Sequence, residues 1–206
     1  MMKSSANQKC RFIETIRIED GIGCNLAYHQ ERMRRTCSAF FPGREFPRLV
    51  DLLKDTAGRP GITKARIEYG EEGILDRQYT PYTMRTIRSF RLVEDNSISY
   101  AYKSADRSGF EKLLRGKGDA DEIIIVQNGL LTDTSFSNIA LWDGADWYTP
   151  AAPLLAGTMR QSLLDRRLVQ EANITVDQLE HYSKISLINA MLPLGRCVVT
   201  FPWADK

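Results

Sequence analysis

The sequence of 206 residues predicts an α+β protein of two domains. Short stretches of alternating apolar and polar residues indicate strands, and the pairs Asn128-Gly129 and Asp143-Gly144 are typical of hairpin turns. The mixture of these hairpins with segments of helical apolar spacing suggests two α+β domains rather than a doubly wound sheet. The short polar run 94–97 contains no apolar residue, and we interpret it as the linker between domains at 1–93 and 98–206.

The first domain is expected to be small and to combine a sheet with helices. Residues 12–18 alternate near period two, which predicts a strand with one buried face, and Met33, Cys37 and Phe40 lie on one stripe of a predicted helix. In order, we expect a strand over 12–18, a turn at 19–21, a helix over 26–41, a short helix after Pro47, a strand over 63–69, a turn at 70–73 and one or two strands within 79–93.

The second domain is expected to begin with a segment that leads to a lone lysine, Lys103. The apolar run within 122–126 predicts a strand that is buried on both faces. In order, we expect a helix over 104–114, a hairpin of strands over 122–126 and 130–132, a second hairpin over 139–142 and 147–148, a helix over 157–171, and strands over 174–176, 185–189 and 198–201.

Composition restricts the classes of function. The net charge is only +2, so bulk charge predicts no nucleic-acid partner, and no apolar run is long enough to span a bilayer. The four cysteines form no CxxC pair and only two histidines are present, so no metal site is expected. Free thiols and an N-terminal segment without an apolar signal core predict a cytoplasmic protein.

Three separated features together point to one cofactor. Lys103 is a candidate nucleophile, Asp133 lies in the small polar loop 131–138, and Gly157 opens a helix whose first N–H groups suit a phosphate. Pyridoxal 5′-phosphate (PLP) requires a lysine for a Schiff base, an acid at its ring nitrogen and a nest for its phosphate. Each feature alone also has an ordinary explanation: a solvated lysine, an aspartate that caps a turn and a plain helix start.

From about Phe12 to Leu194 the sequence resembles the class IV aminotransferases, the PLP enzymes of fold type IV. The segment 29–33 is similar to the family's His-x-x-Arg-Leu helix, and 157–160 is similar to its Gly-Ile-Thr-Arg turn. The resemblance implies a small N-terminal α/β domain, a larger C-terminal pseudo-barrel domain, PLP as the cofactor and a homodimer.

The resemblance assigns the central roles to Lys103 and Arg32. Lys103 takes the position of the catalytic lysine, which forms the Schiff base with PLP, and Arg32 takes that of the phosphate ligand. A guanidinium suits this task because it grips phosphate with two hydrogen bonds and a permanent charge. Arg32 also belongs to a basic cluster with Arg34 and Arg35, which a solvated helix face would explain equally well.

Four further residues are expected around the cofactor. Asp133 stands where the family usually has Glu, one methylene longer, and would keep the ring nitrogen protonated. Asn138 would order the loop that carries Asp133. Thr158 and Met159 would bind the phosphate, and Met159 could do so only through its main chain because its side chain has no hydroxyl.

The residues that would contact a substrate resemble those of the 4-amino-4-deoxychorismate lyases. Asn189 and Ala190 lie in a closing strand and turn similar to theirs, and Arg77 and Tyr79 form an Arg-x-Tyr pattern where D-amino acid aminotransferases carry Arg-x-His. The resemblance favours a lyase that converts 4-amino-4-deoxychorismate to 4-aminobenzoate and pyruvate. An aminotransferase for branched-chain or D-amino acids, or a homologue that binds PLP without catalysis, are the alternatives.

Overall fold

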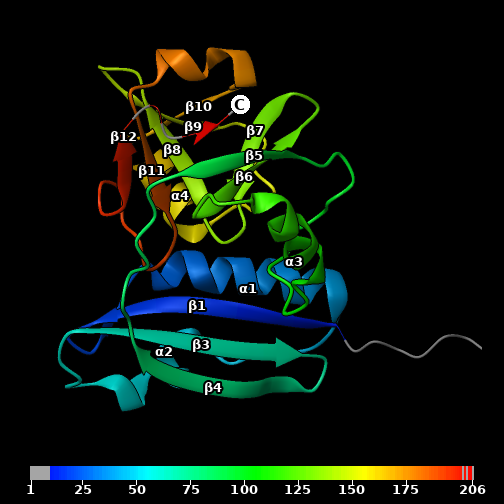
Figure 1. Cartoon of the computed structure of the whole chain (residues 1–206). Coiled ribbons are helices and arrows are strands. Elements are labelled where there is room, and N and C mark those ends of the chain that lie inside the picture. The colour runs from blue at the N-terminus through cyan, green and yellow to red at the C-terminus, as the bar shows by residue number, and fades with distance from the viewer. Residues whose placement is uncertain (1–9, 201, 203, 206) are drawn as a thin grey trace, which may run out of the picture.

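The computed structural model describes residues 10–200, 202, 204 and 205, and it is an α+β fold with three sheets (Figure 1). The first half of the chain forms an antiparallel sheet in the order β2-β1-β3-β4. Its elements are β1 (Arg11–Glu19), β2 (Ile22–Gly23), α1 (Leu26–Phe40), α2 (Leu49–Leu52), the 3-10 helix η1 (Lys54–Thr56), β3 (Ile62–Gly70) and β4 (Gly73–Pro81).

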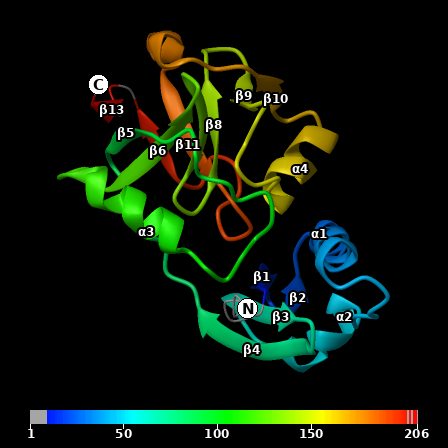
Figure 2. The same cartoon turned by 90° about the vertical axis from the view of Figure 1, so that its right-hand side faces the viewer.

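The second half forms two sheets, in the orders β13-β5-β6-β7 and β10-β9-β8-β11-β12. Figure 2 shows these sheets on one side of the molecule and the sheet of the first half, with α1 and α2, on the other. The elements are β5 (Phe90–Glu94), α3 (Ser108–Leu114), η2 (Arg115–Lys117), β6 (Glu122–Gln127), β7 (Leu130–Thr134), β8 (Asn138–Trp142), β9 (Trp147–Pro150), α4 (Thr158–Asp165), β10 (Gln170–Ala172), η3 (Val176–His181), β11 (Lys184–Ile188), β12 (Val198–Thr200) and β13 (Ala204–Asp205).

The structure confirms most of the predicted elements, because their apolar periodicity matches burial. In β1 the side chains of Phe12, Ile16 and Ile18 are buried in one cluster with Met33 of α1 and with β3. The predicted hairpin between β6 and β7 turns at 128–129, where both residues have positive φ, as a type I′ turn requires. Among the described residues, no helix is both long and apolar enough to cross a membrane.

Several predicted boundaries are wrong. The helix expected over 104–114 begins only at Ser108, because 103–105 pairs with the edge of β1. The helix expected over 157–171 ends at Asp165, where the N–H groups of Arg167 and Leu168 close the last turn and Arg167 adopts positive φ. Of the strand expected over 174–176, only an isolated bridge between Thr175 and Leu130 is present, and η3, capped by Thr175, begins at Val176. β4 begins at Gly73 rather than near 79.

The change from one sheet to the next occurs earlier than the predicted linker. β5 pairs in parallel with β6, so it belongs to the sheets of the second half, and the irregular segment 82–89 joins it to β4. The polar run 94–97 therefore follows a strand of the second half. The polar residues do mark a surface loop. However, β5 pairs with β6, about thirty residues later in the chain, so the chain passes from the first sheet to the sheets of the second half before that loop. The extent of the two domains, 1–93 and 98–206, stays a prediction.

Candidate active site

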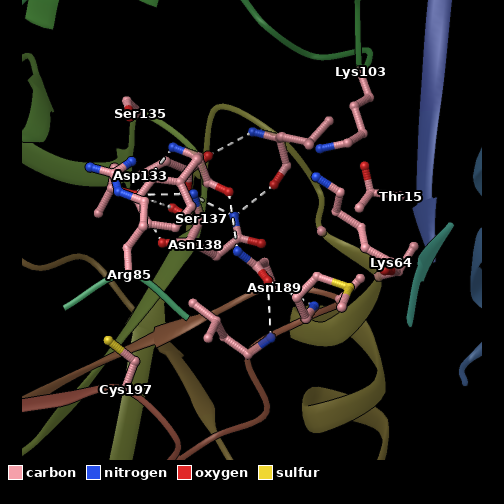
Figure 3. Close-up of a pocket in the computed structure, with 18 of the residues that line it drawn as sticks. Thr15, Lys64, Arg85, Lys103, Asp133, Ser135, Ser137, Asn138, Asn189 and Cys197 are labelled. Carbon is pink, nitrogen blue, oxygen red and sulfur yellow. Dashed lines mark hydrogen bonds between the residues drawn. The ribbon is translucent and has the colours of Figure 1, made fainter. Parts of the chain in front are cut away.

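A cavity of about 640 Å³ lies between the two halves of the chain. Side chains of both halves line it, which Figure 3 shows for ten labelled residues. The first half contributes Thr15, Arg32 and Lys64, and the second half contributes Lys103, Asp133 and Asn189. A concave site with a few converging polar groups is the usual form of a small-molecule site.

Lys103 is held at this cavity by the edge of β1. β1 pairs with β3 along its whole length but with β2 only at one end, so its other edge is free at residues 11–13. The N–H of Ile13 donates to the Lys103 carbonyl at 2.9 Å, and the N–H of Ala105 donates to the Arg11 carbonyl at 2.8 Å. These bonds fix the backbone of the lysine, and Figure 3 shows its side chain reaching into the cavity.

The environment of Lys103 favours its neutral form. Removal from water, and then the nearby Arg32 guanidinium, lower the pKa of Lys103 from 10.5 to about 7. A large fraction of the amine is therefore unprotonated near neutral pH. The free amine is the form that attacks a carbonyl carbon or accepts a proton, so Lys103 is the candidate nucleophile and base of the site.

Arg32 extends from α1 and is fixed by a buried carboxylate on β1. Its Nε and Nη2 donate to Glu14 at 2.9 and 2.5 Å, and His29 donates from Nδ1 to the same carboxylate at 2.6 Å. Burial alone would raise the pKa of Glu14, but Arg32 and His29 hold it at about 2. Burial also lowers the pKa of His29, so its ring is neutral and Nε2 accepts from Thr158 Oγ1 at 3.2 Å. Glu14 thus occupies one edge of the Arg32 guanidinium, formed by Nε and Nη2, and within the described residues Nη1 has no hydrogen bond to the protein, while Arg32 lines the cavity.

Asp133 lies on β7 at the opposite wall and is surrounded by neutral donors. Asn138 donates from Nδ2 to Asp133 Oδ1 at 2.7 Å, and the N–H of Leu155 donates to Oδ2 at 2.9 Å. Burial raises the pKa of Asp133 to about 7 despite these bonds. A cationic N–H placed in the cavity beside Asp133 would find a carboxylate that lacks a counterion.

Asn138 orders the Asp133 loop, as predicted, and also explains the glycine at 157. Its Nδ2 donates both to Asp133 and to the Leu155 carbonyl at 2.8 Å, which joins β7 to the segment before α4. A Cβ on Gly157 would lie only 1.9 Å from Asn138 Oδ1. A side chain at position 157 would therefore displace the amide that aligns Asp133.

Thr158 and Met159 form the first turn of α4. The first N–H groups of a helix have no partner within the helix, and its dipole favours an anion there. Thr158 lines the cavity, whereas the Met159 side chain packs with Leu163 in the core. Met159 is not among the residues that line the cavity, so its binding of a phosphate through the main chain stays a prediction.

Arg77 and Tyr79 do not line the cavity, contrary to the prediction. Arg77 donates from Nη1 to the Leu52 carbonyl at 2.8 Å, and Tyr79 Oη lies 3.1 Å from the same carbonyl and 3.0 Å from Asp55. Both side chains pack on the α2–η1 side of β4, because strand alternation turns them away from the face that carries Lys64. The spacing of Arg77 and Tyr79 on a strand shows that both side chains lie on the same face of the sheet. It does not show whether that face is the one toward the cavity.

Asn189 and Ala190, which were predicted to contact a substrate, line the cavity. Asn189 Oδ1 accepts from the N–H groups of Met191 and Leu192 at 2.8 and 3.0 Å, which closes the turn after β11. Asn189 therefore shapes the cavity wall, and Ala190 beside it leaves space for a bound molecule.

Sequence reasoning missed Glu14, Lys64 and Arg85. Glu14 could have been found, because it falls on the buried face of its strand, and a buried carboxylate needs a cationic partner such as Arg32. Lys64 had a similar signal, since it alternates with the buried Thr63 and Ala65 and so must face the other side of β3. Arg85 lies in the irregular segment 82–89 and carried no signal.

Comparison with known proteins identifies the family. Residues 74–198 match the family described as amino-transferase class IV. An uncharacterized protein of Haemophilus influenzae is 34% identical over 182 residues, which covers 86% of this chain and 96% of that protein. This chain belongs to the class IV aminotransferases, whose structures include PLP-bound forms.

Solved structures agree with this assignment. The crystal structure of "a putative 4-amino-4-deoxychorismate lyase" from Haemophilus somnus is 33% identical, with a TM-score of 0.84, and the match covers 92% of this chain and all of that one. A "putative amino-acid aminotransferase" from Mesorhizobium loti has a TM-score of 0.77 at 20% identity, covering 95% of this chain and 99% of that one. The second likeness is one of fold alone, and together they show the fold of the type IV PLP enzymes.

Proposed function

We propose that the protein is a PLP-dependent lyase that converts 4-amino-4-deoxychorismate to 4-aminobenzoate and pyruvate. The observation that carries this proposal is the placement of Lys103, whose amine has a pKa of about 7, in one cavity with Arg32 and Asp133. The choice of a lyase is supported by the likeness, at 33% identity over the whole of the other chain, to a structure described as a putative lyase of this kind.

The donor set of the cavity fits PLP. The Nη1 atom of Arg32 and the first N–H groups of α4 suit its phosphate, Asp133 suits a protonated ring nitrogen, and Lys103 suits its aldehyde. When bound, PLP supplies an aldehyde that combines with amines and a ring that withdraws electrons from the adjacent carbon. Asp133 would hold the ring-nitrogen proton on which this withdrawal depends.

Lys103 would carry the proton during the reaction. Its neutral amine accepts the proton from the substrate carbon that bears the amino group. The electron pair left on that carbon expels the enolpyruvyl oxygen from the neighbouring ring carbon, so one C–H and one C–O bond break and the ring becomes aromatic. The proton returns to the departing enol, which leaves as pyruvate, and no oxidant or reductant is consumed.

An aminotransferase is the second candidate, and the family itself favours it. A hypothetical aminotransferase of Mycobacterium tuberculosis, solved in an "alpha-ketoglutarate and PMP bound form", has the same fold with a TM-score of 0.78 at 17% identity. In that reaction Lys103 would return the proton to the cofactor carbon instead of passing it to a leaving group. The two reactions therefore share their first proton transfer and differ in the fate of the substrate.

The test follows the products. Purified protein loaded with PLP is given 4-amino-4-deoxychorismate, and pyruvate and 4-aminobenzoate are measured; the proposal expects both in equal amounts. Separate reactions with branched-chain and D-amino acids plus 2-oxoglutarate are followed for glutamate. Glutamate formation without pyruvate release would replace the lyase with an aminotransferase. Neither product, with PLP bound, would indicate a binding protein without turnover.

We also propose that the protein acts as a homodimer, as the resemblance implies, and that it is cytoplasmic, as its free thiols and N-terminal segment predict. Light scattering of the purified protein tests the assembly. A monomer that retains full activity would contradict the dimer.

A further inference from the structure

The cavity carries an excess of positive charge that PLP alone does not use. Five basic residues line it, whereas Asp133 is the one acidic residue among its described lining residues; the basic ones are Arg32, Lys64, Arg85, Lys103 and Arg107. A cavity of one sign of charge attracts ligands of the opposite sign. PLP brings one phosphate, so the remaining cations indicate a further anionic ligand.

Three of these cations already have tasks. Arg32 is paired with Glu14, and Lys103 is the candidate nucleophile. Arg107 donates from Nη2 to the Ser135 carbonyl, and its guanidinium packs over the Phe110 ring at 4.7 Å. These contacts fix Arg107 in the wall of the cavity. Lys64 and Arg85 are the two that remain.

Lys64 and Arg85 both retain donors for a ligand. In the described part of the chain, the Lys64 ammonium makes no recorded hydrogen bond or ion pair, although the side chain is half-buried and lines the cavity. Arg85 Nη2 forms an ion pair with Glu122 Oε2 at 3.8 Å, which is too long for a hydrogen bond and so leaves its N–H groups free to donate, and its guanidinium stacks over the Phe136 ring at 5.3 Å. Stacking orients the Arg85 fork without consuming its N–H groups.

The two side chains come from different walls. Lys64 extends from β3 in the first half, and Arg85 belongs to the segment 82–89. Figure 3 shows them on opposite sides of the group formed by Asp133, Asn138 and Asn189. A ligand that reaches both must carry two separate anionic groups.

We infer that Lys64 and Arg85 determine specificity by each binding one carboxylate of a dicarboxylate substrate. This inference rests on the proposed function. Pyruvate and 4-aminobenzoate each contain one carboxylate, and neither carboxylate is formed in the reaction, so the substrate must carry both. A branched-chain or simple D-amino acid has only one, and would leave one cation of the cavity without a partner.

The experiment uses a stable mimic that cannot react. 3-(Carboxymethoxy)benzoate has a ring carboxylate and an ether-linked carboxylate but no amine, and its two matched fragments are 3-methoxybenzoate and phenoxyacetate. Binding of all three to the PLP-loaded protein is measured by calorimetry. We expect the dicarboxylate to bind about tenfold to a hundredfold more tightly than either fragment, as for a charge-assisted hydrogen bond.

In each of the variants Lys64→Met and Arg85→Met, the dicarboxylate should bind no more tightly than one of the two fragments. That fragment should differ between the two variants, because each variant loses the partner of a different carboxylate. Lys64→Arg should restore part of the tighter binding of the dicarboxylate, and neither Met variant should lose PLP. Lys184→Met and Arg88→Met are matched controls, because both residues are exposed and lie outside the cavity lining. These controls should bind the dicarboxylate as the unaltered protein does.

Two outcomes would overturn the inference: equal binding of dicarboxylate and fragments, or a loss of PLP affinity in Lys64→Met, which would assign Lys64 to the phosphate. Failure of the proposed function is separate, since it appears as absence of pyruvate release. Preference for the dicarboxylate without pyruvate release would keep the two-carboxylate site and reject the lyase. Melting temperatures of all variants exclude a loss of binding through unfolding.

Discussion

Glu14 and Asp133 are both buried carboxylates near one cavity, yet their pKa values move in opposite directions. Glu14 accepts two hydrogen bonds from Arg32 and one from His29, and its pKa falls to about 2. Asp133 accepts hydrogen bonds from the Asn138 amide and the Leu155 N–H, and burial raises its pKa to about 7. Burial raises the pKa of both carboxyl groups, and only at Glu14, where the Arg32 guanidinium and His29 outweigh that effect, does the pKa end below its usual value, because neutral donors do not replace a cation.

The difference separates two tasks. Glu14 already has its counterion, and it serves to hold Arg32 in place between β1 and α1. Asp133 forms no ion pair within the described part of the chain, and it can provide a strong interaction to a cation that enters the cavity. Variants at these two positions and at their neighbours test whether Glu14 has a structural task and Asp133 a catalytic one.

The largest effect, on turnover, is expected at Lys103, which lines the same cavity. Lys103→Ala removes both the nucleophile and the base, so turnover should fall by at least about a hundredfold to ten-thousandfold. The fold should persist, because the backbone bonds of Lys103 to β1 do not involve its side chain. Turnover is assayed, and borohydride reduction followed by peptide mapping locates the lysine bonded to PLP. A pyridoxyl group found on the same peptide in the variant would refute the assignment.

At Glu14 the expected effect is on stability. Glu14→Gln leaves the buried Arg32 guanidinium without its counterion, and breaking a buried pair costs about 3–5 kcal/mol. The free energy of unfolding, from denaturant titration of the PLP-free protein, measures this loss. Glu31→Gln is the control, since its pair with Arg34 lies at the surface and should cost about 1 kcal/mol or less. If Glu14→Gln lowered the free energy of unfolding as little as the control does, the Glu14 carboxylate would not be needed to stabilise the buried Arg32 guanidinium.

At Asp133 the expected effect is on turnover. Asp133→Asn keeps the shape but cannot hold the ring-nitrogen proton, so turnover should fall by roughly a hundredfold to a thousandfold. PLP should remain bound through its phosphate, and Asp133→Glu, the usual family residue, should retain substantial activity. Bound PLP and turnover are measured together. Full activity of Asp133→Asn would reduce Asp133 to a turn residue.

Arg32 should affect cofactor affinity less strongly. Arg32→Ala removes a charge-assisted hydrogen bond to phosphate, about 1.5–3 kcal/mol, or roughly tenfold to a hundredfold in PLP affinity. Because this change also strands Glu14, the double variant Glu14→Gln with Arg32→Met is the cleaner measurement. PLP binding is titrated by absorbance, with turnover measured at saturating PLP. Unchanged affinity in the double variant would remove Arg32 from the phosphate site.

The last comparison is the pH dependence of stability of the PLP-free protein. The lowered pKa of Glu14 contributes stability above about pH 4.5 that is lost as pH falls toward 2. The raised pKa of Asp133 has the opposite sign: stability should decline as pH rises from about 4 to 7. Asp133→Asn should abolish only the decline in stability as pH rises toward 7. Glu14→Gln should abolish only the loss of stability as pH falls toward 2. Identical pH profiles for the two variants would contradict the comparison.

Local chemistry in the sequence was enough to predict the residues that would face a cofactor. Lys103, Asp133 and the glycine turn at 157 are far apart in the chain, but each carries a residue type or backbone feature that PLP requires, and all of them reach the cavity. Periodicity likewise determined most strands and helices, because burial of one face selects the spacing of apolar residues.

Tertiary structure alone decided which neighbours each side chain meets. It turned Arg77 and Tyr79 away from the cavity and brought Lys64 and Arg85 into it, since the face that a strand presents depends on what packs against it. It also ended the helices at Ser108 and Asp165, where pairing and turn bonds outweigh helix propensity. The opposite pKa shifts of Glu14 and Asp133 arise in the same way, because a carboxylate's charge depends on partners that only folding brings near.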